Sequence, residues 1–234
     1  MKKNVMMRIA SFLLVAVLIS TSAISGTYAK YVTDGKSSDS ARVAHFGVEV
    51  TANYNDFFKS EYNTSKAWTG DDGVSVKSVL GGDVVAPGTM GELADFVVTG
   101  TPEVDVDVTY TPVLTLENWD ADGDEYCPII FNVNGKLYFI DGTNIKSVAE
   151  LTTAVQNAIV ASTAKYNAGT DLSTVVADDL YVSWMWQFDN TDPAFKNADG
   201  QNDTADTHLG NWLKNGKAAP TISLEIKCTV TQID

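Results

Sequence analysis

Strict alternation of apolar and polar side chains is the feature that most constrains how this chain can fold. Every second residue is apolar in residues 104–110, and residues 221–231 repeat the pattern over a longer run. Successive side chains of a strand point to opposite faces of a sheet, so the pattern predicts strands with one buried and one solvated face. Such strands are typical of antiparallel sheets, and the chain is therefore expected to be mainly β.

A β-hairpin is predicted at Asn134-Gly135. The apolar segments 129–133 and 136–140 flank this pair. Asn-Gly readily adopts the left-handed backbone that a two-residue hairpin loop requires, so the two segments are expected to pair as antiparallel strands.

A second chain reversal is expected at Pro87-Gly88. Proline fixes φ at the second position of a type II turn, and glycine supplies the positive φ of the third. A strand at residues 181–188 is expected to place Val182, Trp184, Trp186 and Phe188 on one face. Further strands are expected in residues 43–51, 78–85 and 93–99, and a long loop is expected in residues 52–76.

One helix is predicted among these strands. Ser147 and Glu150 have the spacing of a capping box, in which the two side chains satisfy backbone N–H groups of the first turn. Apolar residues follow at helical spacing, namely Val148, Leu151, Val155 and Ile159. Many strands with one lone helix predict an antiparallel β-sandwich that carries a hairpin-plus-helix insertion at about residues 127–170.

Residues 1–29 have the organisation of a secretory signal peptide. A positively charged start is followed by an apolar run at residues 9–20 and by small residues that end at Ala29. Small side chains before the cut predict cleavage between Ala29 and Lys30. A membrane-spanning helix needs about 20 apolar residues, and an uncleaved anchor is the alternative. The protein is expected to be secreted, with a flexible N-terminus at residues 30–42 and a single domain at residues 43–234.

The mature chain is strongly acidic. The full sequence holds 16 basic and 30 acidic residues, and three of the basic residues but none of the acidic ones lie in residues 1–29. Cleavage therefore leaves a net charge of −17. Such a charge repels phosphate backbones and anionic lipid, so no nucleic-acid partner and no membrane association after processing are expected. The apolar and aromatic content is that of a folded domain.

The two cysteines, Cys127 and Cys228, both lie in the mature chain. An oxidising exterior permits a disulfide between them. The alternative is a pair of buried thiols that act as small apolar residues. Their separation in sequence does not decide between the two, because it says nothing about their distance in space.

No catalytic residue is predicted. The sequence holds no nucleophile elbow, P-loop, paired Cys-x-x-Cys or zinc-protease motif, and its only histidines are His45 and His208. A zinc site would need further ligands at a supporting spacing, which the two histidines lack. His45 lies among apolar residues and is expected to be a half-buried strand residue. The chain is therefore expected not to be an enzyme.

Two acidic loops offer oxygen ligands for calcium. From Asp120 to Asp124 the carboxylates alternate as they do at the start of a calcium loop, but the glycine and glutamate that complete an EF-hand are missing. Calcium is thus the one cofactor that the sequence suggests, and a solvated acidic surface is the alternative. The candidate ligands are Asp120, Asp122, Asp124, Asp199, Asp203 and Asp206.

Several segments, in the same order, resemble the TasA/camelysin family of Gram-positive bacteria. The signal junction and first strand are SGTYAKYVTDGKSSDSARVAHFGVEV, at residues 25–50. The proline-glycine turn and two strands are VAPGTMGELADFVVTGTPEVDVDVTYT, at residues 85–111. The C-terminal part contains SWMWQF, ADTHLGN and TISLEIKCTVTQID, which is similar to the end of many SipW-processed proteins.

The resemblance implies a jelly-roll-like domain and trimming by a SipW-type signal peptidase. It also implies assembly of copies of the chain into fibres of the biofilm matrix or cell surface. The freed N-terminus of one subunit would add a strand to the next, a mode in which backbone hydrogen bonds to an open sheet edge supply much of the association. The candidate donor segment is residues 30–41, beginning with Lys30, Tyr31, Val32 and Thr33.

Two other functions stay open at the level of sequence. A secreted adhesin or ligand-binding module could use aromatic residues of the 52–76 region, although these residues could equally pack over the core. They are Phe57, Phe58, Tyr62 and Trp68. Camelysin-like proteins have also been classed with metallopeptidases, but this chain has no metallopeptidase motif from which catalytic residues could be assigned.

Overall fold

The computed structural model describes residues 42–52, 57–65, 74–92, 96–176, 180–187 and 203–233. The expected signal peptide, the Ala29–Lys30 cleavage site and the donor segment that begins at Lys30 lie outside these residues. The chain divides into two units, residues 1–46 and 47–234. The fold described below is that of the second unit.

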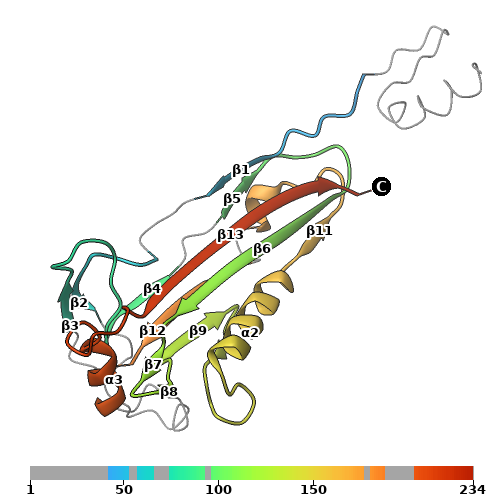
Figure 1. Ribbon diagram of the computed structural model, residues 1–234. Coiled ribbons are helices and arrows are strands. Elements are labelled where there is room, and N and C mark those ends of the chain that lie inside the picture. The colour runs from blue at the N-terminus through green and yellow to red at the C-terminus, as the bar shows by residue number, and fades with distance from the viewer. Residues whose placement is uncertain are drawn as a thin grey trace, which may run out of the picture. The chain divides into compact units, whose positions relative to one another are not determined.

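The second unit is mainly β, as the sequence predicts (Figure 1). The strands are β1 (Glu49–Ala52), β2 (Glu61–Ser65), β3 (Val74–Lys77), β4 (Met90–Glu92), β5 (Phe96–Thr99), β6 (Val106–Glu117), β7 (Asp120–Ala121), β8 (Asp124–Glu125), β9 (Ile129–Val133), β10 (Lys136–Tyr138), β11 (Ala164–Tyr166), β12 (Val182–Trp186) and β13 (Thr221–Gln232). The helices are α2 (Val148–Val160), the short 3-10 helix η2 (Leu172–Thr174) and α3 (Asp203–Gly210).

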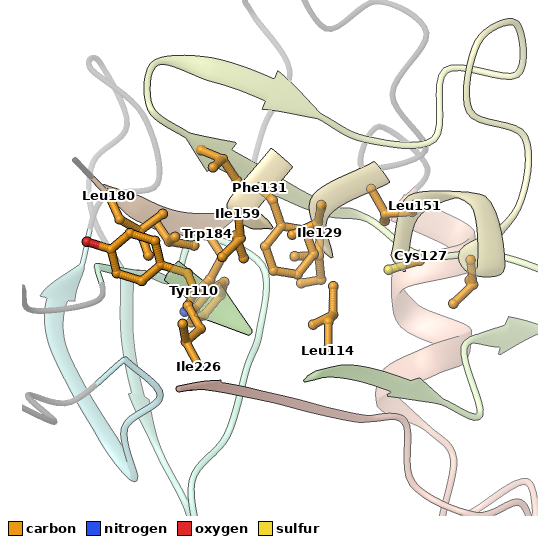
Figure 2. Close-up of a cluster of buried hydrophobic side chains, with 14 of the residues drawn as sticks. Tyr110, Leu114, Cys127, Ile129, Phe131, Leu151, Ile159, Leu180, Trp184 and Ile226 are labelled. Carbon is orange, nitrogen blue, oxygen red and sulfur yellow. The ribbon is translucent and has the colours of Figure 1, made fainter. Parts of the chain in front are cut away.

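The described sheets are antiparallel and open. β6 lies between β11 and β13 in a three-stranded sheet, and a four-stranded sheet has the order β10-β9-β12-β4. The pairs β1–β5, β2–β3 and β7–β8 each form a two-stranded sheet. The two larger sheets contribute to one hydrophobic core, which includes Trp184 of β12, Tyr110 of β6 and Ile226 of β13 (Figure 2).

The longest ladder confirms the period-two pattern of the sequence. β6 and β13 pair over twelve residues without a register shift, from Thr221 opposite Glu117 to Gln232 opposite Val106. Val106, Val108 and Tyr110 are buried in the core, whereas the alternate residues of β6 are half-buried or exposed. One face of the sheet is thus apolar and the other polar.

Helix α2 confirms the predicted capping box. The Ser147 hydroxyl accepts a hydrogen bond from the Glu150 N–H at 3.1 Å, and the Glu150 carboxylate accepts one from the Lys146 N–H at 2.7 Å. The four predicted apolar residues of the helix are all buried. α2 packs against β6 and β9, on the side of β6 away from β13 (Figure 1).

Replacing the Ser147 cap is expected to weaken the fold modestly. Ser147→Ala removes the acceptor for one N–H of the first turn, which typically costs about 1 kcal/mol. Urea denaturation should show this loss. Thr153→Ala is the matched control, because Thr153 is exposed on the same helix and bonds only to the carbonyl of Ala149. An equal loss in both variants would contradict the capping role.

Both predicted turns are confirmed. Asn134 and Gly135 have φ of 50° and 82°, and Lys136 pairs directly with Val133 across the hairpin. At the second turn Gly88 has φ of 85°, and the Thr89 N–H donates to the Ala86 carbonyl at 3.0 Å.

The expected long loop at residues 52–76 is wrong in part, because it contains β2 and β3. Tyr62 of β2 is buried, and the Phe58 ring lies 5.3 Å from that of Trp184. Phe57 also packs against the core. These aromatics therefore cover the core, which explains how a polar segment holds strands. Trp68 lies outside the described residues.

Two expected strands are shorter than predicted or absent. β1 begins only at Glu49, after Gly47 with φ of 47° has turned the chain, and His45 is exposed instead of half-buried. Residues 78–85 form no strand beyond a single bridge between Val84 and Lys59. Positive φ at the glycines of positions 81 and 82 explains the interruption, since that backbone cannot continue a strand.

β12 buries both faces, although alternation suggested one. Val182, Trp184 and Trp186 enter the core as expected. Met185 joins Ile130 in a second, smaller cluster on the opposite face. The main core covers one face of β12, and Ile130 with the partly buried Met90, Leu137 and Phe139 packs around Met185 on the other. Phe188 lies outside the described residues.

Candidate functional site

β13 presents an open backbone edge. It is hydrogen bonded to β6 along one side, and in the described chain no strand pairs with its other side. An unpaired edge displays a row of N–H and C=O groups that can pair with another strand. Natural proteins commonly interrupt such edges with proline, bulges or very short strands. β13 has no proline, no register shift and twelve residues.

A row of partly exposed apolar side chains follows this edge. On β6 the core-facing Val108, Tyr110 and Leu114 are at most 4% exposed. On β13 their neighbours on the same face remain half-buried, with the exception of Ile226. The half-buried row consists of Ile222, Leu224, Cys228 and Val230. We call this row, together with the side of β13 with which no described strand pairs, the β13 edge. Its side chains are more exposed than Val108, Tyr110 and Leu114 of β6.

The folded unit begins close to this edge. A Cβ atom on Gly100 would lie 2.0 Å from the carbonyl oxygen of Gly47, so the two backbones can approach only because residue 100 is glycine. β1 starts two residues after Gly47 and lies within contact distance of β13 without pairing with it. Val50 of β1 is 39% exposed.

The acidic segment at residues 120–125 is a tight hairpin. Asp122 and Gly123 have φ of 62° and 95° and form its two-residue loop between β7 and β8. The Asp120 carboxylate accepts a hydrogen bond from the Gly123 N–H and forms an ion pair with Lys217. Hydrogen bonding to Lys217 first, and to Gly123 second, lowers the pKa of Asp120. The Asp122 N–H donates to Nδ1 of His208 at 3.1 Å.

Asp206 is a buried carboxyl on α3. The Tyr126 hydroxyl donates a hydrogen bond to it at 2.7 Å. Burial raises the pKa of Asp206 to about 6, and hydrogen bonding from Tyr126 and Trp186 only partly offsets this rise. Among the described residues, the indole N–H of Trp186 has no hydrogen-bond acceptor. We therefore regard Tyr126 as the partner that holds this carboxyl.

The six candidate calcium ligands do not form one site within the described chain. No three His, Cys, Asp or Glu side chains gather there in an arrangement that could hold a metal ion. Asp120 is engaged by Lys217, and Asp206 by Tyr126. Asp122, Asp124 and Asp203 are exposed, and Asp199 lies outside the described residues. Calcium binding stays a prediction from the sequence.

Of the two alternatives for the cysteines, the structure has the thiols and not the disulfide. Cys127 is buried just before β9, and Cys228 is half-buried on β13 opposite Tyr110. Figure 2 shows Cys127 and Tyr110 at opposite ends of the labelled core cluster, which explains why a bridge is not formed. Both act as small apolar core residues, the alternative that the sequence left open.

No family model, curated protein or solved structure matches this chain. Among the described helices, none is both long enough and apolar enough to cross a membrane. The β13 edge is thus the feature with the clearest capacity for interaction. Its strand and its two faces were predictable from alternation, but its position at the edge of a sheet was not.

Proposed function

We propose that this chain is a secreted structural protein that assembles head to tail into extracellular or cell-surface fibres of a biofilm matrix. In this proposal a SipW-type signal peptidase cuts before Lys30, and residues 30–41 of one copy add a strand to the β13 edge of the next. The observation that carries the proposal is the outer side of the twelve-residue strand β13, with which no described strand pairs, beside its half-buried apolar row.

The proposed fold is a jelly-roll-like sandwich in which the three- and four-stranded sheets are the two layers. Trp184 of β12 and Tyr110 of β6 belong to one buried core, which supports this arrangement. The β9–β10 hairpin, predicted as part of an insertion, supplies two strands of the four-stranded layer, and α2 follows it in the chain. α2 covers the side away from β13, so the side at β13 is the one where a guest strand fits.

Net charge also favours the pairing of residues 30–41 with the β13 edge of another copy. Residues 30–41 hold two basic and two acidic residues, and the cut before Lys30 adds a free α-amino group, whereas residues 42–234 hold 11 basic and 28 acidic residues. With that amino group the donor segment carries about +1, and the side chains of the rest of the mature chain carry −17. A weakly cationic segment is attracted to the acidic body of another copy, and this attraction is screened by salt. Head-to-tail exchange does not close on itself, so it yields filaments.

Among the described residues, the buried core residues and the apolar residues packed on them lie between Val48 and Val230. Removing residues 30–41 should therefore leave a folded protein that lacks a strand to donate.

The deciding experiment compares mature protein with a variant lacking residues 30–41. Electron microscopy should show fibres for the mature protein only, while circular dichroism and sedimentation should show a folded monomer for the deletion. Unchanged fibres in the deletion variant would refute the proposal. A mature protein that stays monomeric, with residues 30–41 protected from proteolysis, would also refute it, because the segment would then complete its own subunit.

A pair of substitutions on β13 tests the acceptor edge. Leu224→Lys places a charge in the half-buried row, and its long stem lets the charge reach water without unfolding the strand. Ser223→Lys is the control on the exposed, opposite face. We expect loss of fibres in Leu224→Lys and normal fibres in Ser223→Lys.

The adhesin and metallopeptidase alternatives gain no specific support. Phe57, Phe58 and Tyr62 pack into the core and so are not available as a binding surface. Neither alternative has a set of described side chains that would carry it.

A further inference from the structure

We propose that Asn215 is a site of spontaneous deamidation and that His208 assists the reaction. The chain contains two Asn-Gly pairs, Asn134-Gly135 and Asn215-Gly216. Asn-Gly is the sequence most prone to this chemistry, because glycine has no side chain to hinder attack by its backbone nitrogen. In the structure, the two pairs differ in the hydrogen bonds of the asparagine side chain and of the glycine backbone nitrogen.

The reaction consumes water and releases ammonia. The backbone nitrogen of the glycine loses its proton and bonds to Cγ of the asparagine. The bond from Cγ to Nδ2 breaks, and Nδ2 leaves as ammonia once it has gained a proton, which gives a five-membered succinimide. Water then opens this ring at either carbonyl, so the product is aspartate or isoaspartate. Water supplies the proton that Nδ2 gains, and a neighbouring N–H group can assist by donating a hydrogen bond to Nδ2 as its bond to Cγ breaks.

His208 is placed beside the departing nitrogen of Asn215. Nδ2 of Asn215 lies 3.4 Å from Nε2 of His208. Nδ1 of the same ring accepts a hydrogen bond from the Asp122 N–H at 3.1 Å. An accepting Nδ1 carries no proton, so the neutral ring must carry its proton on Nε2. The Nε2–H also faces Asp122 Oδ1 at 3.7 Å, and it can donate to Nδ2 of Asn215 once attack on Cγ gives that nitrogen a lone pair.

The backbone nitrogen of Gly216, which attacks Cγ of Asn215, is also accessible. Asn215 is exposed, and an added Cβ on Gly216 would meet no atom within 4 Å. The Gly216 N–H bonds only to the carbonyl of Leu213, at a long 3.2 Å. There is room for the succinimide ring, and the attacking nitrogen is weakly held.

Hydrogen bonds hinder the same reaction at the Asn134-Gly135 pair. The Asn134 side chain accepts from the Tyr181 N–H at 2.6 Å and donates to the Ser162 hydroxyl at 2.9 Å. The Gly135 N–H donates to Asn132 Oδ1 at 2.8 Å. Both ends of the amide and the attacking nitrogen are thus fixed by short hydrogen bonds, which must break before the ring can close.

Reaction at Asn215 would change the contact between this turn and the β7–β8 hairpin. It adds a carboxylate beside His208, and the isoaspartate form adds one backbone atom directly before residue 216. Lys217, which pairs with Asp120 of the hairpin, follows immediately. The modification is independent of the fibre proposal, since neither residues 30–41 nor the β13 edge takes part.

The test is peptide mapping by mass spectrometry of mature protein incubated at neutral pH, with aspartate and isoaspartate quantified at both sites. We expect Asn215 to deamidate at least about tenfold faster than Asn134 in the folded protein, which corresponds to about 1.4 kcal/mol in barrier height. In urea the two sites should react at similar rates. Comparable rates at the two sites in the folded protein would overturn the assignment of Asn215.

His208→Leu tests this hydrogen bond. The loss of one hydrogen bond costs about 0.5–1.5 kcal/mol, so we expect the substitution to slow Asn215 by up to about tenfold. The rate at Asn134 in the same molecule is the internal control and should not change. Simple loosening of the turn would speed the reaction, so an unchanged or faster rate at Asn215 would overturn the role of His208.

Discussion

Replacing Gly91 with alanine is expected to lower the free energy of unfolding by about 3 kcal/mol, combining strain with loss of a buried hydrogen bond. A Cβ at this position would lie 2.0 Å from the carbonyl oxygen of Phe57 and 2.6 Å from Nε1 of Trp184. These two atoms form a hydrogen bond of 2.7 Å with each other. The methyl group must therefore separate the donor and acceptor that it contacts.

The control for this variant is Gly210→Ala. Gly210 ends α3, and an added Cβ there would meet no atom within 4 Å. Alanine is a better helix former than glycine, so the control should be neutral or more stable by up to about 1 kcal/mol. Urea denaturation of both variants checks the prediction. A Gly91→Ala variant as stable as the parent would show that residues 57–58 can move away from β4 at little cost.

Gly91 also shows which kind of contact cannot be predicted from the sequence. The capping box of α2 and the Asn134-Gly135 hairpin were predictable because their interactions join residues at most seven positions apart. The Trp184–Phe57 bond joins residues 127 positions apart. Nothing near Phe57 in sequence indicates this partner, so the segment looked like a loop. Its tertiary contacts override its weak local pattern.

The same distinction applies to the candidate site. Alternation assigned the faces of β13 correctly, because side-chain direction along a strand is a local property. Whether a strand has one neighbour or two depends on the whole sheet. Alternation placed Val182, Trp184 and Trp186 on one face of β12 but did not show that the opposite face is also buried, and it did not show that β13 has an open edge. The edge that carries the proposed function is thus a property of topology alone.

The acidic residues were predicted as a group and are separated by the fold. Asp120 and Asp122 lie in the β7–β8 hairpin, and Asp206 lies on α3. The alternating carboxylates suggested a shared cation. Lys217 instead pairs with Asp120, 97 positions earlier in the chain. Tyr126 bonds to Asp206 from 80 positions away. These contacts join α3 and the following turn to the hairpin by charged and polar groups, so the stability of this region should depend on pH.

Asp206→Asn is expected to remove much of that dependence. The folded-state pKa of about 6 lies above the ordinary value of 3.8, so between these values the folded protein keeps a proton that the unfolded chain releases. The stabilisation that Asp206 gives is fully present below pH 3.8 and is lost as the pH rises through 6. A shift of this size corresponds to at most about 3 kcal/mol.

Asparagine keeps an acceptor for the Tyr126 hydroxyl and never ionises, so the variant should be more stable than the parent at pH 7 and about equal to it at pH 3.5. Urea denaturation across this pH range measures the difference. Asp124→Asn is the matched control, because Asp124 is an exposed aspartate of the neighbouring hairpin. If Asp206→Asn and Asp124→Asn show the same pH profile as the parent, burial of Asp206 does not govern the acid stability of this region, and the fold here depends on the Asp120–Lys217 pair instead.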